Sequence, residues 1–333
     1  MELELVNLRS QGKEIIATID DILGPAEQRY FGEGYKRTQY QCSIHYQEKH
    51  AQGLISVSYK NDWSKKKTKE RKPHLSTIDA FLIAGQISYG LIKRSFHLSK
   101  DQMAQSWIRN ISIKAGAEAL ENLDSVIVNA TLVNSEPSID SMFGMLSRVK
   151  TTLDSMEVEV IIDHSIGKLN FCELSSEDND EYFSDDFRLR RCQLENNTFS
   201  DSVCAVSSEL VFQCPEKQSV GAMGQYPNAL MMVDWLTCFA QLAQLIMYRL
   251  DNLDRSNTHN LWMRSVSVST PYPIIPRRKH ILTLRSLKNA LVSKNDQSWR
   301  LSTVSGSVAG HPEFNLTAKL CHQLPQMPQG EVA

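Results

Sequence analysis

The sequence predicts an α+β protein made of two copies of one domain, each a long buried helix wrapped by a curved antiparallel sheet. The first observation behind this prediction is an internal repeat with a constant separation of 155 positions (234 − 79) over the helix and the strand that follows it. The recurring residues are Asp79 and Asp234, Gln86 and Gln241, Trp107 and Trp262, Arg109 and Arg264.

The second observation is the size of the repeat. A period of this length is far longer than one layer of a solenoid, so each copy is expected to be a whole folding unit. The chain has 333 residues, which suits two domains of ordinary size. Its hydrophobic content of 41% and charged content of 22% are typical of a globular protein that can fill two cores.

The third observation is that each copy follows one order of elements: strands, a long helix, then more strands with β-branched, alternating patterns. In the first copy, β-prone runs within 18–59 and a basic loop at 64–73 precede the helix. The expected elements there are a helix over about 76–94 and strands over 107–113, 125–133 and 157–163.

The second copy repeats that order and sets the predicted domain boundaries. Its expected elements are a strand over 202–212, a helix over about 228–251, and strands over 263–269, 280–287, 299–308 and 314–322. The predicted domains are a first repeat over 1–174, an acidic linker over 175–186, a second repeat over 187–325 and a disordered tail over 326–333.

The second helix is apolar on nearly every face. Its stretch 229–248 is about long enough to span a bilayer, but Asp234, Gln241 and Gln244 make it too polar for lipid. A helix that is apolar all round and excluded from lipid is expected inside a domain, and only a strongly curved sheet can cover it. These features are typical of a hotdog fold, here a tandem double hotdog with a pseudo-twofold axis within one chain.

Several function classes lack support in the sequence. A net charge of −2 and the absence of a basic stripe argue against nucleic acid. The start at Met1 has no signal-peptide pattern, so we expect a cytoplasmic protein. Seven cysteines without Cys-x-x-Cys spacing predict free thiols rather than disulfides or zinc. No metal-ligating histidine spacing, phosphate-cradling glycine loop or Gly-x-Ser-x-Gly occurs, so neither a metal nor a cofactor is expected.

Asp79 and Asp234 are the candidate catalytic bases. Asp79 lies in Ser76-Thr77-Ile78-Asp79, a capping-box pattern, so its carboxylate can equally serve only the first turn of its helix. If the second helix begins near residue 228, Asp234 lies two turns inside it and needs a partner or a raised pKa. If that helix begins near Met232, both acids are first-turn residues.

The other candidates surround these two acids. His74 is a possible acid–base partner, and its counterpart Ala229 is inert, so catalysis should differ between the copies. Each Gln lies two helical turns after its Asp and can hold a substrate carbonyl or bond the backbone. Trp107 and Arg109, like Trp262 and Arg264, point to one face of a strand, where Arg can bind an anion or pair with the buried Asp of its own copy. The basic run at 65–72 would suit an acidic carrier or a coenzyme phosphate, or be a solvated loop.

The segment 21–35 and the two Asp-x6-Gln helices resemble the avirulence protein D (AvrD) family, over nearly the whole chain. The segment reads Asp-Ile-Leu-Gly-Pro-Ala-Glu-Gln-Arg-Tyr-Phe-Gly-Glu-Gly-Tyr. More distantly, the chain is similar to the A-factor synthases, hotdog proteins from whose Glu-Ala-x-x-Gln helix it departs.

The resemblance implies an acyltransferase or condensing synthase that joins a β-ketoacyl thioester, on acyl carrier protein or coenzyme A, to a ketopentose such as xylulose. The product would be a syringolide-like acyl glycoside, a plant elicitor, made in secondary metabolism. Asp79, Asp234 or His74 would then act on protons, while the glutamines, arginines and tryptophans bind substrate. The alternatives are a hotdog thioester hydrolase or dehydratase, or a non-catalytic acyl-binding module. A homodimer is possible.

Overall fold

The computed structural model describes residues 13–60, 72–167, 186–214, 221–253, 260–275, 280–294 and 296–325. Two long helices dominate it, α3 (Thr77–Ser95) and α6 (Met232–Leu250). The N-terminal segment and first-half strands are β1 (Lys13–Thr18), β2 (Gln39–Tyr46), β3 (His50–Ser58), β4 (Trp107–Lys114), β5 (Val126–Pro137), β6 (Gly144–Leu153) and β7 (Met156–Ser165). The second-half strands are β8 (Arg191–Ser200), β9 (Ala205–Gln213), β10 (Leu261–Ser269), β11 (His280–Lys294), β12 (Gln297–Val308) and β13 (His311–Gln323).

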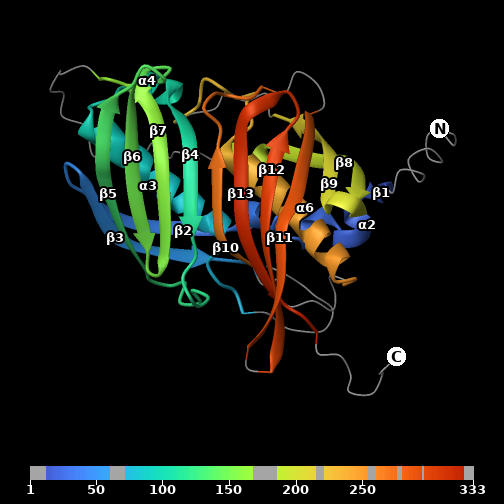
Figure 1. Ribbon diagram of the computed structural model, residues 1–333. Helices are drawn as coiled ribbons and strands as arrows, with labels where there is room; N and C mark the ends of the chain where they lie inside the picture. The colour runs from blue at the N-terminus through green and yellow to red at the C-terminus, as the bar shows by residue number, and fades with distance from the viewer. Residues whose placement is uncertain are drawn as a thin grey trace, which may run out of the picture.

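All of these strands join in one antiparallel sheet of thirteen strands, in the order β1-β8-β9-β11-β12-β13-β10-β4-β7-β6-β5-β3-β2 (Figure 1). The remaining helices are short: α2 (Ile19–Leu23), α4 (Lys100–Gln105), α5 (Asp186–Leu189) and the 3-10 turns η1 (Ala26–Gln28), η2 (Gly34–Arg37) and η3 (Asp201–Val203). The predicted α+β class is confirmed as a large antiparallel sheet with few helices. No described helix is both long and apolar enough to cross a membrane.

The two halves of the sheet correspond strand for strand. Outward from the junction, the first half runs β4-β7-β6-β5-β3-β2 and the second runs β10-β13-β12-β11-β9-β8. At the junction Ser112 of β4 pairs with Ser267 of β10, and these two serines are themselves 155 positions apart (267 − 112). Because equivalent residues face each other, the register places an approximate twofold axis between them.

Each long helix packs against its own half of the sheet. Helix α3 contacts β3, β4, β5, β6 and β7, and α6 contacts β8, β9, β10 and β11. Both helices bury nearly every residue; Phe81 and Trp235, for example, are fully buried. This explains why the two helices lack a polar face, since the sheet and the other helix cover them on all sides.

Helix α3 begins where the sequence predicts, because Ser76 caps the first turn and Asp79 closes the capping box. Helix α6 begins at Met232, so the prediction of a start near 228 is wrong and the alternative start is confirmed. The preceding residues are held out of the helix: Arg190 donates to the carbonyls of Pro227 and Ala229, and the Leu230 amide donates to the carbonyl of Ile274.

The N-terminal segment crosses to the second half of the molecule. Strand β1 pairs with β8, and α2 packs against α6 and β8, as the blue elements at the right of Figure 1 show. The predicted first repeat over 1–174 therefore contains about ten residues at its start that extend the other half. The rest of the predicted division is untested and remains a prediction.

Three strands were not predicted from the sequence: β1, β6 and β8. Strand β8 reads Arg-Cys-Gln-Leu-Glu-Asn-Asn-Thr-Phe-Ser, and its polar residues disguise a strand that has one exposed face. The predicted acidic linker over 175–186 lies, save its last residue, outside the described residues. So do the tail over 326–333 and most of the basic run at 65–72.

Candidate functional site

The loop at residues 24–37 lies between the two halves and touches both long helices. It folds back on itself: the amides of Gly32 and Gly34 both donate to the carbonyl of Arg29, and the Glu33 amide donates to the carbonyl of Ala26. A Cβ at Gly32 would lie 2.3 Å from the Ala26 carbonyl oxygen, so only glycine fits this close backbone contact. The loop is thus held rigidly in one position.

Two adjacent residues of this loop connect it to the polar residues of the two helices. The Arg29 Nη1 atom donates to Gln241 Oε1 of α6 at 2.7 Å, with both side chains buried. The Tyr30 hydroxyl donates to Asp79 Oδ2 of α3 at 2.5 Å. The pattern Arg-Tyr therefore joins the Asp of one copy to the Gln of the other, which the repeat alone does not indicate.

Asp79 is fully buried and surrounded by hydroxyl groups, which we call the tyrosine cluster: Tyr30, Tyr40 and Tyr59, together with Ser76. The Tyr40 hydroxyl donates to Asp79 Oδ1 at 2.6 Å, and the Tyr59 hydroxyl donates to Oδ2. Ser76 adds its hydroxyl at 2.7 Å and its amide at 3.3 Å from Oδ2. With five donors around two oxygens, this carboxylate has little acceptor capacity left for a substrate proton.

The tyrosines of this cluster are held in their neutral, donating form. Burial raises the pKa of Tyr30 well above its ordinary value, and the adjacent Asp79 carboxylate raises it further. The pKa values of Tyr40 and Tyr59 are raised for the same two reasons, in the same order. The cluster is therefore a set of hydroxyl donors oriented by one carboxylate.

Asp234 has different partners, because it pairs with a buried arginine. Arg190 donates through Nε at 3.0 Å and Nη2 at 2.7 Å to Asp234 Oδ2, which also accepts from the Met231 amide at 2.9 Å. Both side chains are almost completely buried. At the offset of 152 that relates β2 to β8, Arg190 stands where the first copy has Thr38, so the two acids lie in unlike surroundings.

Gln241 lies at the wall of a large cavity, which we call the Gln241 cavity. Its volume is about 910 Å³, within the range of about 300 to 1,000 Å³ common for small-molecule sites. The walls come from residues 18–20, the loop at 26–37, Arg188, residues 191–196 and Gln241 itself. Gln86, the equivalent of Gln241, is half-buried and lines neither this cavity nor the pocket described next.

A smaller pocket, the His74 pocket, lies at the start of α3 and is built by both halves. It has a volume of about 80 Å³ and contains His74, Ser76 and Thr77 from the first half, with Trp262 and Arg264 from β10. The rings of His74 and Trp262 are 4.8 Å apart between centroids. Because Ser76 also contacts Asp79, the pocket is connected to the tyrosine cluster.

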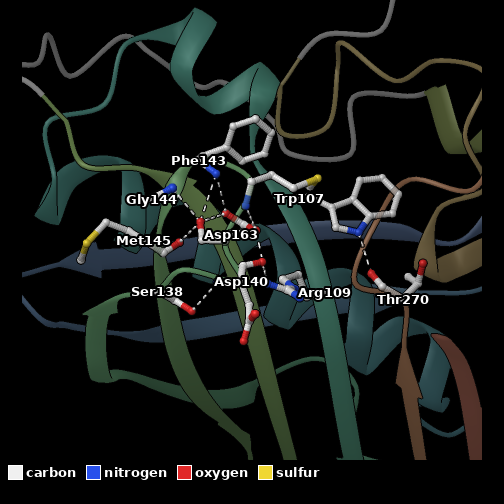
Figure 2. Close-up of polar contacts among 11 residues, drawn as sticks. Trp107, Arg109, Ser138, Asp140, Phe143, Gly144, Met145, Asp163 and Thr270 are labelled. Carbon is white, nitrogen blue, oxygen red and sulfur yellow. Dashed lines mark hydrogen bonds and ion pairs between the residues drawn. The ribbon is translucent and has the colours of Figure 1, made fainter.

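Trp107 and Arg109, the counterparts of Trp262 and Arg264, belong to a different network (Figure 2). Arg109 Nη1 donates to the Asp140 carbonyl at 2.7 Å and lies 3.6 Å from Asp163 Oδ2. Asp163 is buried and accepts from Ser141 and from the amides of Met142 and Phe143. Trp107 is buried and donates its indole N–H to the Thr270 carbonyl at 2.8 Å.

Arg109 does not pair with Asp79, the buried acid of its own copy, which was one of the two expectations from the sequence. Its acidic partner is Asp163 on β7. Asp79 accepts instead from five hydroxyl and amide donors. Arg109 and Asp163 instead fasten the turn that precedes β6.

The predicted site residues thus lie in separate parts of the structure. His74, Trp262 and Arg264 come together, with Asp79 one contact away through Ser76, while Gln241 lines the larger cavity. Five residues of these sites were not predicted from the sequence: Arg29, Tyr30, Tyr40, Tyr59 and Arg190. Arg29 and Tyr30 lie in the segment that carries the family resemblance, which was the one signal for them.

Comparisons with solved structures give weak likenesses to acyl-thioester enzymes. A TesB protein of Mycobacterium avium subspecies paratuberculosis is 10% identical with a TM-score of 0.39, covering 85% of this chain and 96% of its own. The 12:0-ACP thioesterase from Umbellularia californica is 8% identical with a TM-score of 0.43, covering 89% and 99%. The dehydratase domain of PpsC from Mycobacterium tuberculosis, in complex with C12:1-CoA, is 9% identical with a TM-score of 0.27, covering 73% and 82%.

These TM-scores are all below 0.5. No curated protein sequence matches the chain. The model of one protein family, the Pseudomonas avirulence D protein (AvrD), matches residues 14–325. That match spans nearly all of the described residues, including the loop at 24–37 and both long helices. The chain therefore belongs to the AvrD family.

Proposed function

We propose that this protein is a cytoplasmic enzyme that joins a β-ketoacyl thioester to a ketopentose such as xylulose, giving a syringolide-like acyl glycoside. The thioester is carried by acyl carrier protein or coenzyme A. Membership of the AvrD family supports this proposal. The strand-for-strand correspondence of the two halves, each with its own buried helix, supports a tandem double hotdog as the scaffold.

The observation that carries the proposal is the His74 pocket, which combines a histidine, a helix start and residues from both halves. First-turn amides of a helix lack intrahelical acceptors, and such donors stabilise the oxyanion that forms at a thioester carbonyl. We place that carbonyl at the start of α3, beside Thr77. Trp262 and Arg264 then orient the polar end of the acyl group from the second half.

In the proposed reaction, a sugar hydroxyl oxygen attacks the thioester carbonyl carbon and its proton moves to His74. The C–S bond then breaks, and the thiolate leaves with that proton. His74 suits this role better than Asp79, whose two oxygens already accept from five donors. We assign to Asp79 the role of orienting Ser76 and Tyr30. Asp234 remains a candidate base only if Arg190 releases it.

The test is free-thiol release from a β-ketoacyl coenzyme A or carrier thioester, with and without xylulose, followed by mass analysis of the product. Sugar-dependent release with an acyl-pentose adduct is expected. Sugar-independent release would indicate a hydrolase, water loss from a 3-hydroxyacyl chain would indicate a dehydratase, and binding without turnover would indicate an acyl-binding module. Each of these three results contradicts the synthase proposal.

The variant that tests the site is His74→Gln, compared with His45→Gln on the exposed face of β2. Loss of a general base costs about a hundredfold or more in rate, so His74→Gln should lose that much while His45→Gln keeps full activity. Equal activity of the two variants would remove His74 from the mechanism. A homodimer remains a prediction, which light scattering of the same preparations would check.

A further inference from the structure

The Gln241 cavity is a second candidate site, separate in its walls from the His74 pocket. The loop at 24–37 contributes to both: Phe31 lines the pocket, whereas Gly32 and Glu33 line the cavity. Apolar side chains are few in the cavity walls, with Ile19 and Leu194 as the largest. Such walls do not suit an acyl chain, which needs a mostly apolar tunnel.

The charges of the cavity nearly balance, and most of its cations are already engaged by protein acceptors. The cationic side chains in the walls are Arg29, Lys36, Arg37, Arg188 and Arg191, and the anionic ones are Asp20, Glu27, Glu33 and Glu195. Arg29 pairs with Asp20, and Lys36 with Glu33 at 2.8 Å. Arg188 donates to the carbonyls of Lys36 and Thr38.

This arrangement disfavours a phosphate. A phosphate site needs several cations or amides that converge without carboxylates between them, whereas Arg29 and Lys36 each face a carboxylate here. Arg37 also donates to a protein acceptor, the Glu27 carbonyl, at 3.1 Å. Walls that contain both donors and acceptors instead suit a neutral ligand with several hydroxyl groups, because each hydroxyl both donates and accepts.

The amide of Gln241 adds a specific donor. Its Oε1 accepts from Arg29 at 2.7 Å, and its Nε2 donates one hydrogen to the Thr237 carbonyl at 3.2 Å. An amide nitrogen carries two hydrogens, so one hydrogen of Nε2 is not used by these two contacts, and Gln241 is among the residues that line the cavity. Arg29 fixes the orientation of the amide, since a flipped amide would set two donors against each other.

We propose that the Gln241 cavity binds the ketopentose as a neutral, hydroxyl-rich ketone, with Gln241 Nε2 donating to the ketone oxygen and Arg29 acting as the positioning residue. This inference rests on the proposed function for the identity of the ligand. It assigns the sugar to the second half, between α6 and the loop at 24–37. The acyl thioester is assigned to the His74 pocket, which shares the loop at 24–37 with this cavity, so the sugar bound here presents its attacking hydroxyl to the thioester past that loop.

The experiment is an NMR binding titration of the full chain without any thioester, using xylulose, xylitol and xylulose 5-phosphate as probes. Xylulose should bind, and xylitol, which lacks the carbonyl, should bind about tenfold more weakly, as expected for one lost hydrogen bond of this kind. Xylulose 5-phosphate should bind no tighter than xylulose. A phosphate ester that binds more than about tenfold tighter, or no sugar binding at all, would overturn the proposal.

Variants then locate the binding. Gln241→Glu and Gln241→Met should weaken xylulose about tenfold but leave xylitol unchanged, whereas Gln52→Glu on the exposed face of β3 should change neither. Arg29→Met should raise the KM for xylulose with little change in kcat, and Arg29→Lys should recover part of it. Circular dichroism confirms that each variant is folded. Unchanged xylulose affinity in both folded Gln241 variants refutes the site.

This outcome is distinguishable from failure of the proposed function. Sugar-dependent turnover that persists in Gln241→Glu with an unchanged KM for xylulose would leave the synthase proposal standing and place the sugar elsewhere. Xylulose binding that depends on Gln241, in a protein that never releases thiol, would support this inference and contradict the synthase proposal.

Discussion

Replacing Asp79 by alanine should destabilise the protein strongly, and the magnitude follows from the fate of its five donors. Without the carboxylate, Tyr30 and Ser76 still contact each other at 2.8 Å between hydroxyl oxygens, and Tyr59 keeps the His74 carbonyl at 3.1 Å. The Tyr40 hydroxyl, the Ser76 amide and one of the two contacting hydroxyls lose the carboxylate as acceptor, since a contact between two hydroxyls uses only one of their hydrogens. Each buried donor left without a partner costs about 1 to 3 kcal/mol.

The expected loss for Asp79→Ala is therefore about 3 to 9 kcal/mol in the free energy of unfolding, toward the lower end because Tyr40 is only half-buried. Urea unfolding followed by tryptophan fluorescence measures it, and Tyr40→Phe is the matched control. That control removes one donor and leaves four, so it should cost about 0.5 to 1.5 kcal/mol. If Asp79→Ala were no less stable than Tyr40→Phe, the view of Asp79 as an anchor for the cluster would be refuted.

Three further predictions concern the same region. Asp234→Ala should lower the free energy of unfolding by about 3 to 5 kcal/mol, because it leaves Arg190 buried without its carboxylate. In a urea double-mutant cycle, the double variant Asp234→Ala with Arg190→Met should recover much of that loss. Purely additive effects of the two substitutions would contradict the pairing. Because the pKa of Tyr30 is raised in the folded state, the unfolded chain holds fewer protons above about pH 10, so stability should fall as pH rises beyond that value. Ultraviolet absorbance should show that tyrosine ionises together with unfolding. Ionisation of the tyrosine cluster in the still-folded protein would disprove this prediction. Gly32→Ala places a Cβ 2.3 Å from the Ala26 carbonyl, so the loop must shift; xylulose affinity should drop by about tenfold or more, and unchanged affinity would show that the loop does not shape the cavity.

The repeat predicted much of the fold because both copies have the same order of elements, and each packs a long helix against its own half of the sheet. Helices α3 and α6, and strands such as β4 and β10, appear where their patterns indicate. The start of α6 was harder to predict, because the preceding residues are held out of the helix by Arg190, which is distant in sequence. Local propensity contains no information on such a contact.

The sequence predicted which types of residue form the candidate site, but not which other residues they contact. His74, predicted as catalytic, and Trp262 and Gln241, predicted to bind substrate, each line a cavity, and their roles remain proposals. Asp79 and Asp234 look equivalent in sequence, yet one faces tyrosines and the other an arginine. That difference arises from Tyr40 on β2, Tyr59 just after β3 and Arg190 just before β8, whose side chains reach the helices only in the folded sheet.

By itself, the sequence determined that the protein is a duplicated α+β chain of the AvrD type with a polar Asp and Gln on each buried helix, because periodicity and repeat spacing are local, readable properties. Only the tertiary structure decided that the loop at 24–37 joins Asp79 of one helix to Gln241 of the other, and that Arg190 neutralises Asp234. The physical reason is that a buried polar group must find a partner wherever the folded chain supplies one. Here those partners come from 44 to 212 positions away.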